Sequence, residues 1–418
     1  MRIEKLRVKD FRNLEDAEIH FGKGLNVICG ANGAGKTNIL EALHICSIGR
    51  SPRTRKDAET IRAGKRSAEI NLDYIRGEAP RSVGVNIHQT KGKIVLLDGV
   101  PSQKVSDIVG NFASVYFSPD EINIVRGGPQ YRRRYMDIIN CQIGNGYMNN
   151  LRNMQHALKQ RNAILRSIKN ANCYDRALVP WDRQISAYST RVMLRRSLFI
   201  RHIDRLASIA MRILTDNKET LHLTYRTFFD RLTDINVNDF DDVYQQKVRA
   251  SYVRDVATKT SNVGAHLDDI EIKLGYITQT VPGGDRRTEK YSWINLRTAG
   301  SLGQQRTATL AMKLAEVFML SRFYGEKPIL FLDDVLSELD EKRRKQLMDY
   351  CKRFDTVITC TEWDYPAVPD KLFKVENGVV TEMEIDKGNA TPETDIIAGG
   401  QELMEQMLEQ EPESDFNE

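Results

Sequence analysis

The sequence predicts an α/β fold in which an inserted helical arm interrupts the chain of a single head domain. Three observations support this prediction. A short apolar strand, a glycine-rich loop and an apolar-periodic helix follow one another over residues 25–45. A second apolar strand ends in Asp333 and Asp334, 297 positions after Lys36. Between them, residues 151–213 carry apolar side chains at heptad spacing, which is typical of paired helices.

The glycine-rich loop matches the pattern G-x-x-x-x-G-K-[ST] of a P-loop. Gly30 and Gly35 are its two fixed glycines, and Lys36 and Thr37 complete it. Residues without side chains let backbone N–H groups close round phosphates at the start of a helix. In such a loop the lysine neutralises the β- and γ-phosphates, and the threonine hydroxyl holds Mg²⁺. We therefore predict nucleoside triphosphate binding; the alternative is an ordinary glycine turn before a helix.

Length and composition are those of a large globular protein. The 418 residues suffice for two or three domain-sized units, and 41% apolar with 28% charged residues is typical of a soluble chain. Residues 1–5 lack the apolar core of a secretion signal, and no apolar run of about 18 residues occurs. The six cysteines are scattered without zinc-site spacing. We expect a cytoplasmic protein with free thiols and no membrane contact.

Charge is distributed unevenly along the chain. The formal net charge is +4, but residues 386–418 carry ten acids against one lysine. Residues 1–385 therefore carry about +13, which fits a polyanionic partner such as nucleic acid, although basic proteins without such a role exist. The tail is acidic and poor in aromatic residues, so we predict that it is disordered.

Several segments alternate apolar and polar residues or form short apolar runs, as strands do. Those at the start of the chain form a predicted hairpin that leads into the P-loop strand. The segments lie at 3–21, 68–99, 115–117, 221–225, 270–274, 329–333, 356–361 and 372–380.

A helix with an unusual basic start is predicted after residue 128. Pro129 is a suitable first residue, which places Arg132, Arg133 and Arg134 in the first two turns. Because cations near a helix N-terminus oppose the helix dipole, we expect an anion or an acidic surface beside them.

Residues 151–213 are most simply two antiparallel helices that form an arm, each about 30–40 Å long. A segment rich in helix-breaking residues, 170–181, separates the two heptad runs. The arm carries thirteen Lys and Arg against three Asp, a net +10. So one-sided a charge favours nucleic-acid binding; the alternative is a basic helical domain that faces an acidic protein.

Two further motifs lie after the arm. Ser301 precedes a long amphipathic helix that it is suited to cap. Asp333, at the carboxyl end of an apolar strand, is placed to hold Mg²⁺ opposite the Thr37 hydroxyl. The neighbouring Asp334 is then available to orient or deprotonate an attacking water. A gap of 297 residues between Lys36 and Asp333 excludes a compact GTPase layout and leaves an ATPase head interrupted by an arm.

Together these motifs resemble the bacterial RecF family of recombination mediators over roughly residues 1–385. The residues that carry the resemblance are Phe11-Arg12-Asn13, the P-loop, Phe117-Ser118-Pro119-Asp120, the arginines after Pro129, Ser301-x-Gly303-Gln304-Gln305-Arg306 and Leu332-Asp333-Asp334-x3-Glu338-Leu339-Asp340. The resemblance implies an ABC-type, SMC-like P-loop ATPase head with a short arm. It also implies a weak, DNA-stimulated ATPase that acts as a switch, with ATP and Mg²⁺ as cofactors.

The resemblance further implies a role in DNA repair, replication restart and the response to DNA damage, including the SOS response. An ATP-dependent homodimer would bind double-stranded DNA and single-strand/double-strand junctions, and with RecR and RecO would help to load RecA at gaps. The alternative hypothesis is that the protein is the ATPase subunit of a membrane transporter, which shares this type of head. The basic arm has no use in such a subunit.

Site residues carry over position by position from the resemblance. Arg12 and Asn13 correspond to nucleotide contacts. Ser301, Gly303 and Gln304 correspond to a signature that faces the γ-phosphate bound by the other subunit. The catalytic residues are Asp334 and Lys36, and the metal ligands are Thr37 and Asp333. The phosphate loop consists of Gly30, Ala31, Asn32, Gly33, Ala34, Gly35, Lys36, Thr37 and Asn38.

Three departures from the family pattern stand out. Leu267 replaces an arginine in the segment 264–269, and no histidine occurs near Thr359. Asp334 also replaces the more usual Glu, which fits weak hydrolysis. The predicted domains are a discontinuous head at 1–145 and 214–385, a helical arm at 146–213 and the acidic tail at 386–418.

Overall fold

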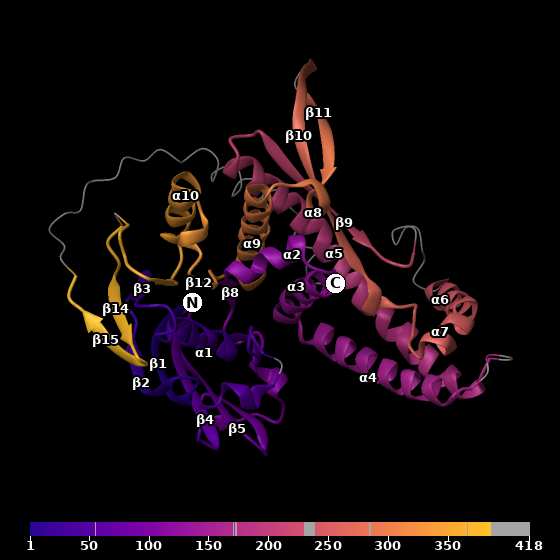
Figure 1. The fold of residues 1–418 in the computed structure, drawn as a ribbon, viewed down its shortest axis with the longest axis horizontal. Helices are drawn as coiled ribbons and strands as arrows, with labels where there is room; N and C mark the ends of the chain where they lie inside the picture. Colours follow the sequence, from indigo (N-terminus) through magenta and orange to yellow (C-terminus); the bar gives the residue numbers. More distant parts are fainter. Residues whose placement is uncertain are drawn as a thin grey trace. The chain divides into compact units, whose positions relative to one another are not determined.

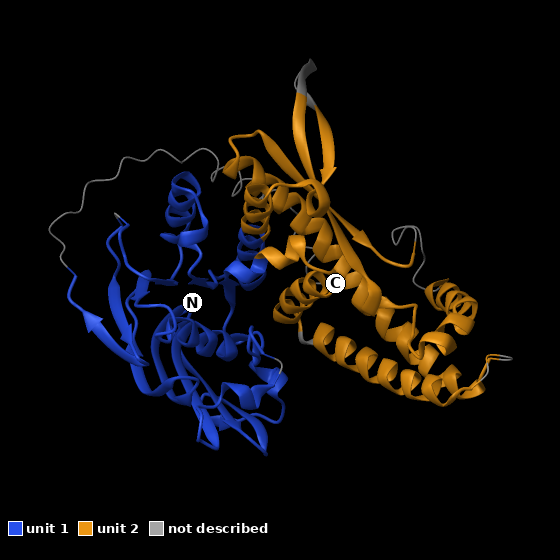
Figure 2. Cartoon of the chain, in the orientation of Figure 1, with its two compact units in different colours: residues 1–121, 313–418 blue, residues 122–312 orange. Residues whose placement is uncertain are grey.

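A computed structural model describes residues 1–54, 56–169, 171, 174–229, 239–283, 286–365 and 367–385. The chain divides into two compact units (Figure 2). Unit 1 comprises Met1–Glu121 and Lys313–Glu418, and unit 2 comprises Ile122–Met312. Unit 2 is larger than the predicted arm, 146–213, because it also takes in sequence on both sides of it. That 146–213 acts as a separate arm stays a prediction, and the acidic tail lies outside the described residues.

The first sheet of unit 1 is antiparallel throughout. Every second residue of its long strands is buried, as Leu6, Val8, Ile70 and Leu72 illustrate. This alternation confirms the strands predicted at 3–21 and 68–99. In order across the sheet, the strands are β2 (Leu14–His20), β1 (Arg2–Phe11), β4 (Ser67–Arg76), β5 (Ala79–His88), β6 (Gly92–Leu97) and β7 (Val100–Pro101).

The second sheet of unit 1 is parallel except for the edge strand nearest the C-terminus, which pairs antiparallel with its neighbour. Two of its central strands are buried at every position, as is typical of a parallel sheet. In order, the strands are β15 (Val379–Met383), β14 (Lys371–Glu376), β3 (Leu25–Cys29), β13 (Thr356–Cys360), β12 (Ile329–Asp333) and β8 (Ser114–Phe117). Parallel pairing brings the carboxyl ends of β3, β13 and β12 to one edge.

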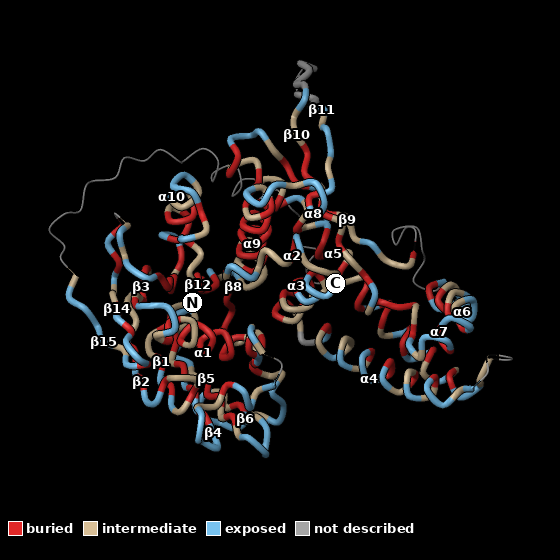
Figure 3. Tube along the Cα trace, viewed as in Figure 1, coloured by how far each residue is buried: buried red, intermediate tan, exposed pale blue. Residues whose placement is uncertain are grey.

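Helix α1 (Lys36–Ile48) packs between the two sheets and contacts β4 and β5 of one sheet and β12 and β13 of the other (Figure 1). It is buried along nearly its whole length, so its sequence is apolar on several sides rather than on one stripe. Figure 3 shows the same continuous burial along β12, whereas buried and exposed residues alternate along α4 (Asn145–Ser167) of unit 2. Unit 1 also contains α10 (Glu341–Cys351).

Unit 2 is built on two long helices, α4 and α5 (Val179–Leu214), which run in opposite directions. Met154 shares one apolar cluster with Val192, and Leu165 shares another with Leu178. The predicted helix pair is therefore present. Helix α5, with 36 residues, is about 54 Å long and exceeds the expected 30–40 Å because it begins well before the first heptad position.

The rest of unit 2 consists of shorter helices and a small antiparallel sheet. Two of its strands were predicted, and the third, β11, was not. The strands are β11 (Arg286–Asn295), β10 (Asp269–Gly283) and β9 (Glu219–Arg226). The helices are α2 (Asn123–Arg126), α3 (Pro129–Ile143), α6 (Phe240–Ala250), α7 (Tyr252–Thr258), α8 (Leu296–Ala299) and the first part of α9 (Leu302–Tyr324), which ends in unit 1.

In the part of the chain that the structure describes, no helix combines the length and the apolar character needed to cross a membrane.

Candidate functional site

The P-loop joins the end of β3 to the first residue of α1, as the sequence predicts. Gly30 and Gly35 have φ angles of 154° and 121°. A Cβ on Gly30 would lie 2.4 Å from the Val375 carbonyl oxygen, and one on Gly35 would lie 2.7 Å from Asn13 Oδ1. Both positions therefore accept only glycine. The result is a loop held against β14 and against the turn after β1.

Lys36 points back into this loop. Its Nζ donates hydrogen bonds to the carbonyl oxygens of Gly30 at 2.6 Å and Ala31 at 3.0 Å, and the residue is only 6% exposed. The ammonium group is thus enclosed by the loop and has no carboxylate partner among the described residues. A buried cation satisfied only by carbonyls is well placed to exchange them for an anionic ligand.

The Asp333 carboxylate, at the end of β12, accepts hydrogen bonds from three hydroxyl groups. Thr37 Oγ1 donates to Asp333 Oδ1 at 2.9 Å, Thr359 Oγ1 donates to the same oxygen at 2.8 Å, and Tyr116 donates to Oδ2 at 2.7 Å. Burial raises the pKa of the Tyr116 hydroxyl and the Asp333 carboxylate raises it further, so this hydroxyl keeps its proton. The sequence alone did not identify Tyr116 or Thr359.

The donor set at this edge of the sheet fits Mg²⁺. One hydroxyl and one carboxylate oxygen are hard ligands, and this ion usually takes few ligands from protein and the rest from phosphate and water. Among the residues described, no cluster of three or more His, Cys, Asp or Glu side chains forms a metal site of another type. Thr37 and Asp333 are the two residues that would hold the ion.

Asp334 follows Asp333 in a left-handed conformation, with φ 52°. Such a conformation costs a non-glycine residue roughly 1 kcal/mol or more and persists where its surroundings enforce it. Here Thr359 enforces it, because the Asp334 N–H donates to the Thr359 carbonyl at 3.2 Å and lies 3.0 Å from its hydroxyl oxygen. One threonine therefore fixes both carboxylate residues.

Arg12, Asn13 and Asn38 brace the site from the side of β1. Arg12 forms two hydrogen bonds with the fully buried Glu41, at 3.0 and 2.7 Å. Asn13 Nδ2 donates to the Ala34 carbonyl at 2.8 Å, and Asn38 Nδ2 donates to Asn13 Oδ1 at 2.8 Å. These side chains hold the loop in place, and their direct contact with a nucleotide stays a prediction.

Ser301, Gly303 and Gln304 lie in unit 2, at the start of α9. Ser301 Oγ accepts a hydrogen bond from the Gln304 N–H at 3.2 Å, and Gln304 Oε1 accepts one from the Ser301 N–H at 2.9 Å. This reciprocal pair is a capping box, which confirms the predicted cap. Gln304 Nε2 also donates to Glu219 and Tyr276, at 2.7 and 2.8 Å. A Cβ on Gly303 would meet nothing within 4 Å.

The basic start of α3 has the acidic partner that the sequence predicts. Arg132, 3% exposed, forms hydrogen bonds of 2.5 and 3.0 Å with Asp269. Arg133 donates to the Asp268 carbonyl at 2.7 Å. The segment 264–269, in which Leu267 replaces an arginine, therefore supplies the carboxylate and the carbonyl that accept hydrogen bonds from Arg132 and Arg133.

Two arginines counted in the basic arm are not on its surface. Arg161 is 1% exposed and bonds to Asp182 at 2.6 Å and Asp255 at 2.7 Å. Arg196 is also 1% exposed and bonds to Asp137 at 2.7 Å and, less closely, to Asp268. The net charge of +10 thus overstates the basic surface, because these two side chains are buried and neutralised by Asp182 and by acids outside 151–213.

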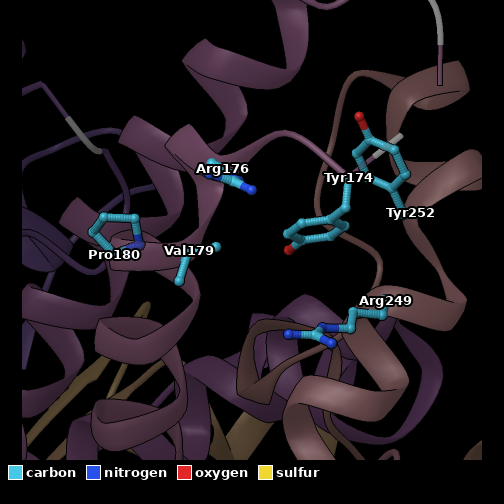
Figure 4. Close-up of a pocket in the computed structure, with 6 residues that line it drawn as sticks. All are labelled: Tyr174, Arg176, Val179, Pro180, Arg249 and Tyr252. Atoms are coloured by element: carbon cyan, nitrogen blue, oxygen red, sulfur yellow. The ribbon is translucent and has the colours of Figure 1, made fainter. Parts of the chain in front are cut away.

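A cavity of about 680 Å³ lies in unit 2, apart from the P-loop. Figure 4 shows the exposed side chains of Arg176 and Arg249 directed into it from two different elements. Neither guanidinium forms an ion pair with a described residue. The remaining lining residues are Tyr174, Val179, Pro180 and Tyr252. Two unpaired cations beside aromatic rings make this a concave, anion-attracting surface.

A P-loop on β3, an aspartate at the end of β12 and a capped helix with the Ser301 signature define an ABC-type ATPase head of the SMC-like class. A family model described as "RecF/RecN/SMC N terminal domain" matches residues 2–378. Solved SMC heads share the fold only: an SmcHead bound to the C-winged helix domain of ScpA has a TM-score of 0.50 at 17% identity, with 92% of this chain and 97% of that one covered.

More similar proteins narrow the class. The DNA replication and repair protein RecF of Lachnoclostridium phytofermentans is 34% identical, with 91% of this chain and 99% of the relative covered. RecF of Acetivibrio thermocellus is 35% identical, over 87% and 94%. A solved recombination mediator RecF, with ATP in the RecFOR pathway, has a TM-score of 0.82 at 27% identity, over 92% and 98%. The chain belongs to the RecF family of DNA replication and repair proteins.

Proposed function

We propose that this protein is an ATP-switched DNA-binding recombination mediator. The observation that carries the proposal is the meeting of Thr37 and Asp333, 2.9 Å apart, at the mouth of a glycine loop that encloses Lys36. A phosphate chain in the loop would replace the carbonyl oxygens of Gly30 and Ala31 as the partners of Lys36. Family membership favours this hypothesis over the transporter subunit.

Each residue at the edge of the sheet has a separate role in the proposed mechanism. Lys36 would bind the β- and γ-phosphates, and Thr37 with Asp333 would hold Mg²⁺, which would supply charge neutralisation at the phosphates. Thr359 and Tyr116 keep the Asp333 carboxylate in orientation. Asp334 orients or deprotonates the attacking water. Hydrolysis of ATP is slow and stimulated by DNA. It therefore returns the protein from the ATP-bound to the ATP-free state and does not serve as a metabolic reaction.

The second half of the site comes from another copy of the chain. Helix α9 has 23 residues, and its N-terminal end, with the exposed Ser301 before it and the open Gly303 in its first turn, is suited to an anion such as a γ-phosphate. Two chains in a head-to-head dimer would therefore sandwich two ATP molecules, each between one P-loop and one Ser301-Gly303-Gln304 signature. ATP is thus the ligand that closes the dimer.

DNA is the proposed partner of the basic surface of unit 2. After Arg161, Arg196 and the buried Asp182 are set aside, eleven Lys and Arg of 151–213 remain against two Asp. Arg176 and Arg249 add a cavity where a phosphate can sit beside aromatic rings. We propose binding to double-stranded DNA and to gapped junctions in the cytoplasm, with RecR and RecO, to help load RecA.

A titration of DNA binding against salt and ATP, with dimerisation followed in parallel, tests the proposal. ATP should drive dimerisation and raise the affinity for gapped duplex DNA. That affinity should fall steeply with salt because phosphate contacts release counterions. Affinity that is indifferent to both ATP and salt would contradict the proposal.

A further inference from the structure

Two cysteines lie side by side immediately next to the nucleotide site. Cys29 ends β3 and Cys360 ends β13, and the two residues are register partners in neighbouring parallel strands. Their Sγ atoms are 3.3 Å apart. Both belong to unit 1, and neither has a role in the proposed mechanism.

The positions of the two thiols allow a covalent bond. Neighbouring strands are about 4.8 Å apart, and disulfides form where the Cα atoms are about 4.4–6.8 Å apart. The sulfurs already lie on the same side of the sheet, so closing the bond needs a movement of roughly 1 Å. We propose that Cys29 and Cys360 are a reversible oxidation site, at which a disulfide weakens nucleotide binding.

The two thiols differ in a way that assigns their roles. Cys29 is partly exposed, whereas Cys360 is 8% exposed. The hydrogen bond with Cys360 lowers the pKa of Cys29, and the nearby Lys36 ammonium lowers it further. The same hydrogen bond and burial raise the pKa of Cys360. Cys29 is therefore the attacking thiolate and Cys360 the resolving thiol.

The chemistry balances with a peroxide as the oxidant. The Cys29 thiolate attacks one peroxide oxygen, which gives a sulfenic acid and releases hydroxide. The Cys360 sulfur then attacks the sulfenic sulfur, the S–O bond breaks, and the oxygen leaves as water with the Cys360 thiol proton. In total, two thiols and one hydrogen peroxide give one disulfide and two waters. A dithiol reductant reverses the reaction.

The disulfide would act on the site through adjacent residues. Cys29 precedes Gly30. The Gly30 carbonyl accepts a hydrogen bond from the Lys36 ammonium, and the Gly30 N–H donates one to the Thr361 carbonyl at 3.2 Å. Cys360 follows Thr359, which holds both Asp333 and Asp334. Gly30 has little freedom to move because it lies against the Val375 carbonyl. A cross-link here would therefore displace the P-loop, or Thr359, which orients Asp333, or both.

This effect on nucleotide binding rests on the proposed function, whereas the thiol site does not. We expect the oxidised chain to bind ATP about tenfold more weakly, a typical coupling between adjacent sites. By linkage, saturating ATP with Mg²⁺ should shift the equilibrium between dithiol and disulfide toward the dithiol by the same factor. Bound phosphates would also neutralise Lys36, which otherwise favours the Cys29 thiolate.

The test uses the full-length reduced protein, treated with hydrogen peroxide, alkylated and digested without reductant. Mass spectrometry should find the Cys29 peptide joined to the Cys360 peptide within one chain. Cys360→Ala should lose the link and leave a sulfenic acid at Cys29, which dimedone labels. Cys141→Ser, a change in unit 2, is the matched control and should keep the link.

Three results separate the possible outcomes. Absence of the link when Cys29 is oxidised, or a link from Cys29 to another cysteine, would overturn the oxidation site. A fully linked protein with unchanged ATP affinity would overturn the coupling to nucleotide. A chain that forms the link and binds no ATP in either redox form would contradict the proposed function and leave the thiol site standing.

Discussion

The hydroxyl of Thr37 donates a hydrogen bond of 2.9 Å to the Asp333 carboxylate, across 296 positions of the sequence. The contact exists because β12 and β3 flank β13 in one parallel sheet, so their carboxyl ends meet at the same edge. Unit 2, residues 122–312, is therefore an insertion between two parts of unit 1 that leaves this edge of the sheet intact.

Lys36→Met should abolish ATP binding and, with it, ATP-driven dimerisation. The substitution keeps most of the side-chain length but removes the ammonium group that the P-loop encloses, at a cost of about 2–5 kcal/mol of binding. Isothermal titration calorimetry with ATP and analytical ultracentrifugation measure the two effects. Nucleotide affinity equal to that of the unmodified chain would place the triphosphate elsewhere.

Ser301→Arg should leave ATP binding intact and prevent dimerisation. A guanidinium at the start of α9 would occupy the space intended for the γ-phosphate of the other subunit. Ser301→Ala is the control, because it removes the cap at a cost of about 1 kcal/mol but adds no bulk or charge. Comparable dimer formation by Ser301→Arg and the original chain would refute the composite site.

Asp334→Asn should slow ATP hydrolysis by about 10²–10⁴-fold and trap the ATP-bound dimer. The amide keeps the size of the carboxylate and the left-handed backbone, which asparagine tolerates, but it cannot accept a proton from water. Phosphate release and the dissociation rate from gapped DNA are the measurements. Unchanged turnover would assign the water to another group.

Thr359→Val should raise the Mg²⁺ concentration required for half-maximal ATP hydrolysis by about 10-fold or more, as loss of a partner of a metal ligand does. The change removes the hydroxyl that orients Asp333 and supports the Asp334 N–H. Thr356→Val, at the opposite end of β13, tests whether loss of a buried hydroxyl alone has this effect. Parallel shifts in both variants would argue against a role in holding Asp333.

Arg161→Met should destabilise unit 2 by about 3–5 kcal/mol, because it leaves Asp182 and Asp255 buried without their partner. Arg166→Met, on the exposed side of the same helix, should change the free energy of unfolding by less than about 0.5 kcal/mol. Urea denaturation followed by circular dichroism measures both. If the two variants unfold alike, the ion pairs of Arg161 do not stabilise the fold.

Local patterns in the sequence were sufficient to predict the fold class. They also predicted the P-loop before the arm and the Ser301 cap and Asp333 strand after it. The P-loop follows a fixed spacing, and β12 is an apolar run that ends in two carboxylates, so each can be recognised without its partner. The Ser301 cap is equally local, since it bonds to Gln304 three residues later. The nucleotide contacts themselves stay a prediction.

The remaining features depend on contacts that no local pattern encodes. Arg161 looks like another basic surface residue, and only its pairing with Asp255, 94 positions away, removes it from the surface. Thr359 and Tyr116 become part of the site because β13 and β8 lie beside β12. Thr359 could have been identified because it is the register partner of Asp333 in the neighbouring strand. The sequence contains no comparable signal for Tyr116.

The order of strands in the second sheet of unit 1 constrains how the protein is made. Strand β3 is synthesised early, but both of its neighbours, β13 and β14, come from the last part of the chain. At about 5–20 residues per second, a ribosome needs roughly 20–70 s to bridge that interval. Throughout it, the strand that precedes the P-loop has no partner in its sheet. Strand β3 can therefore pair only after β13 and β14 have been synthesised, and a stop codon before residue 371 would remove the strand against which Gly30 packs.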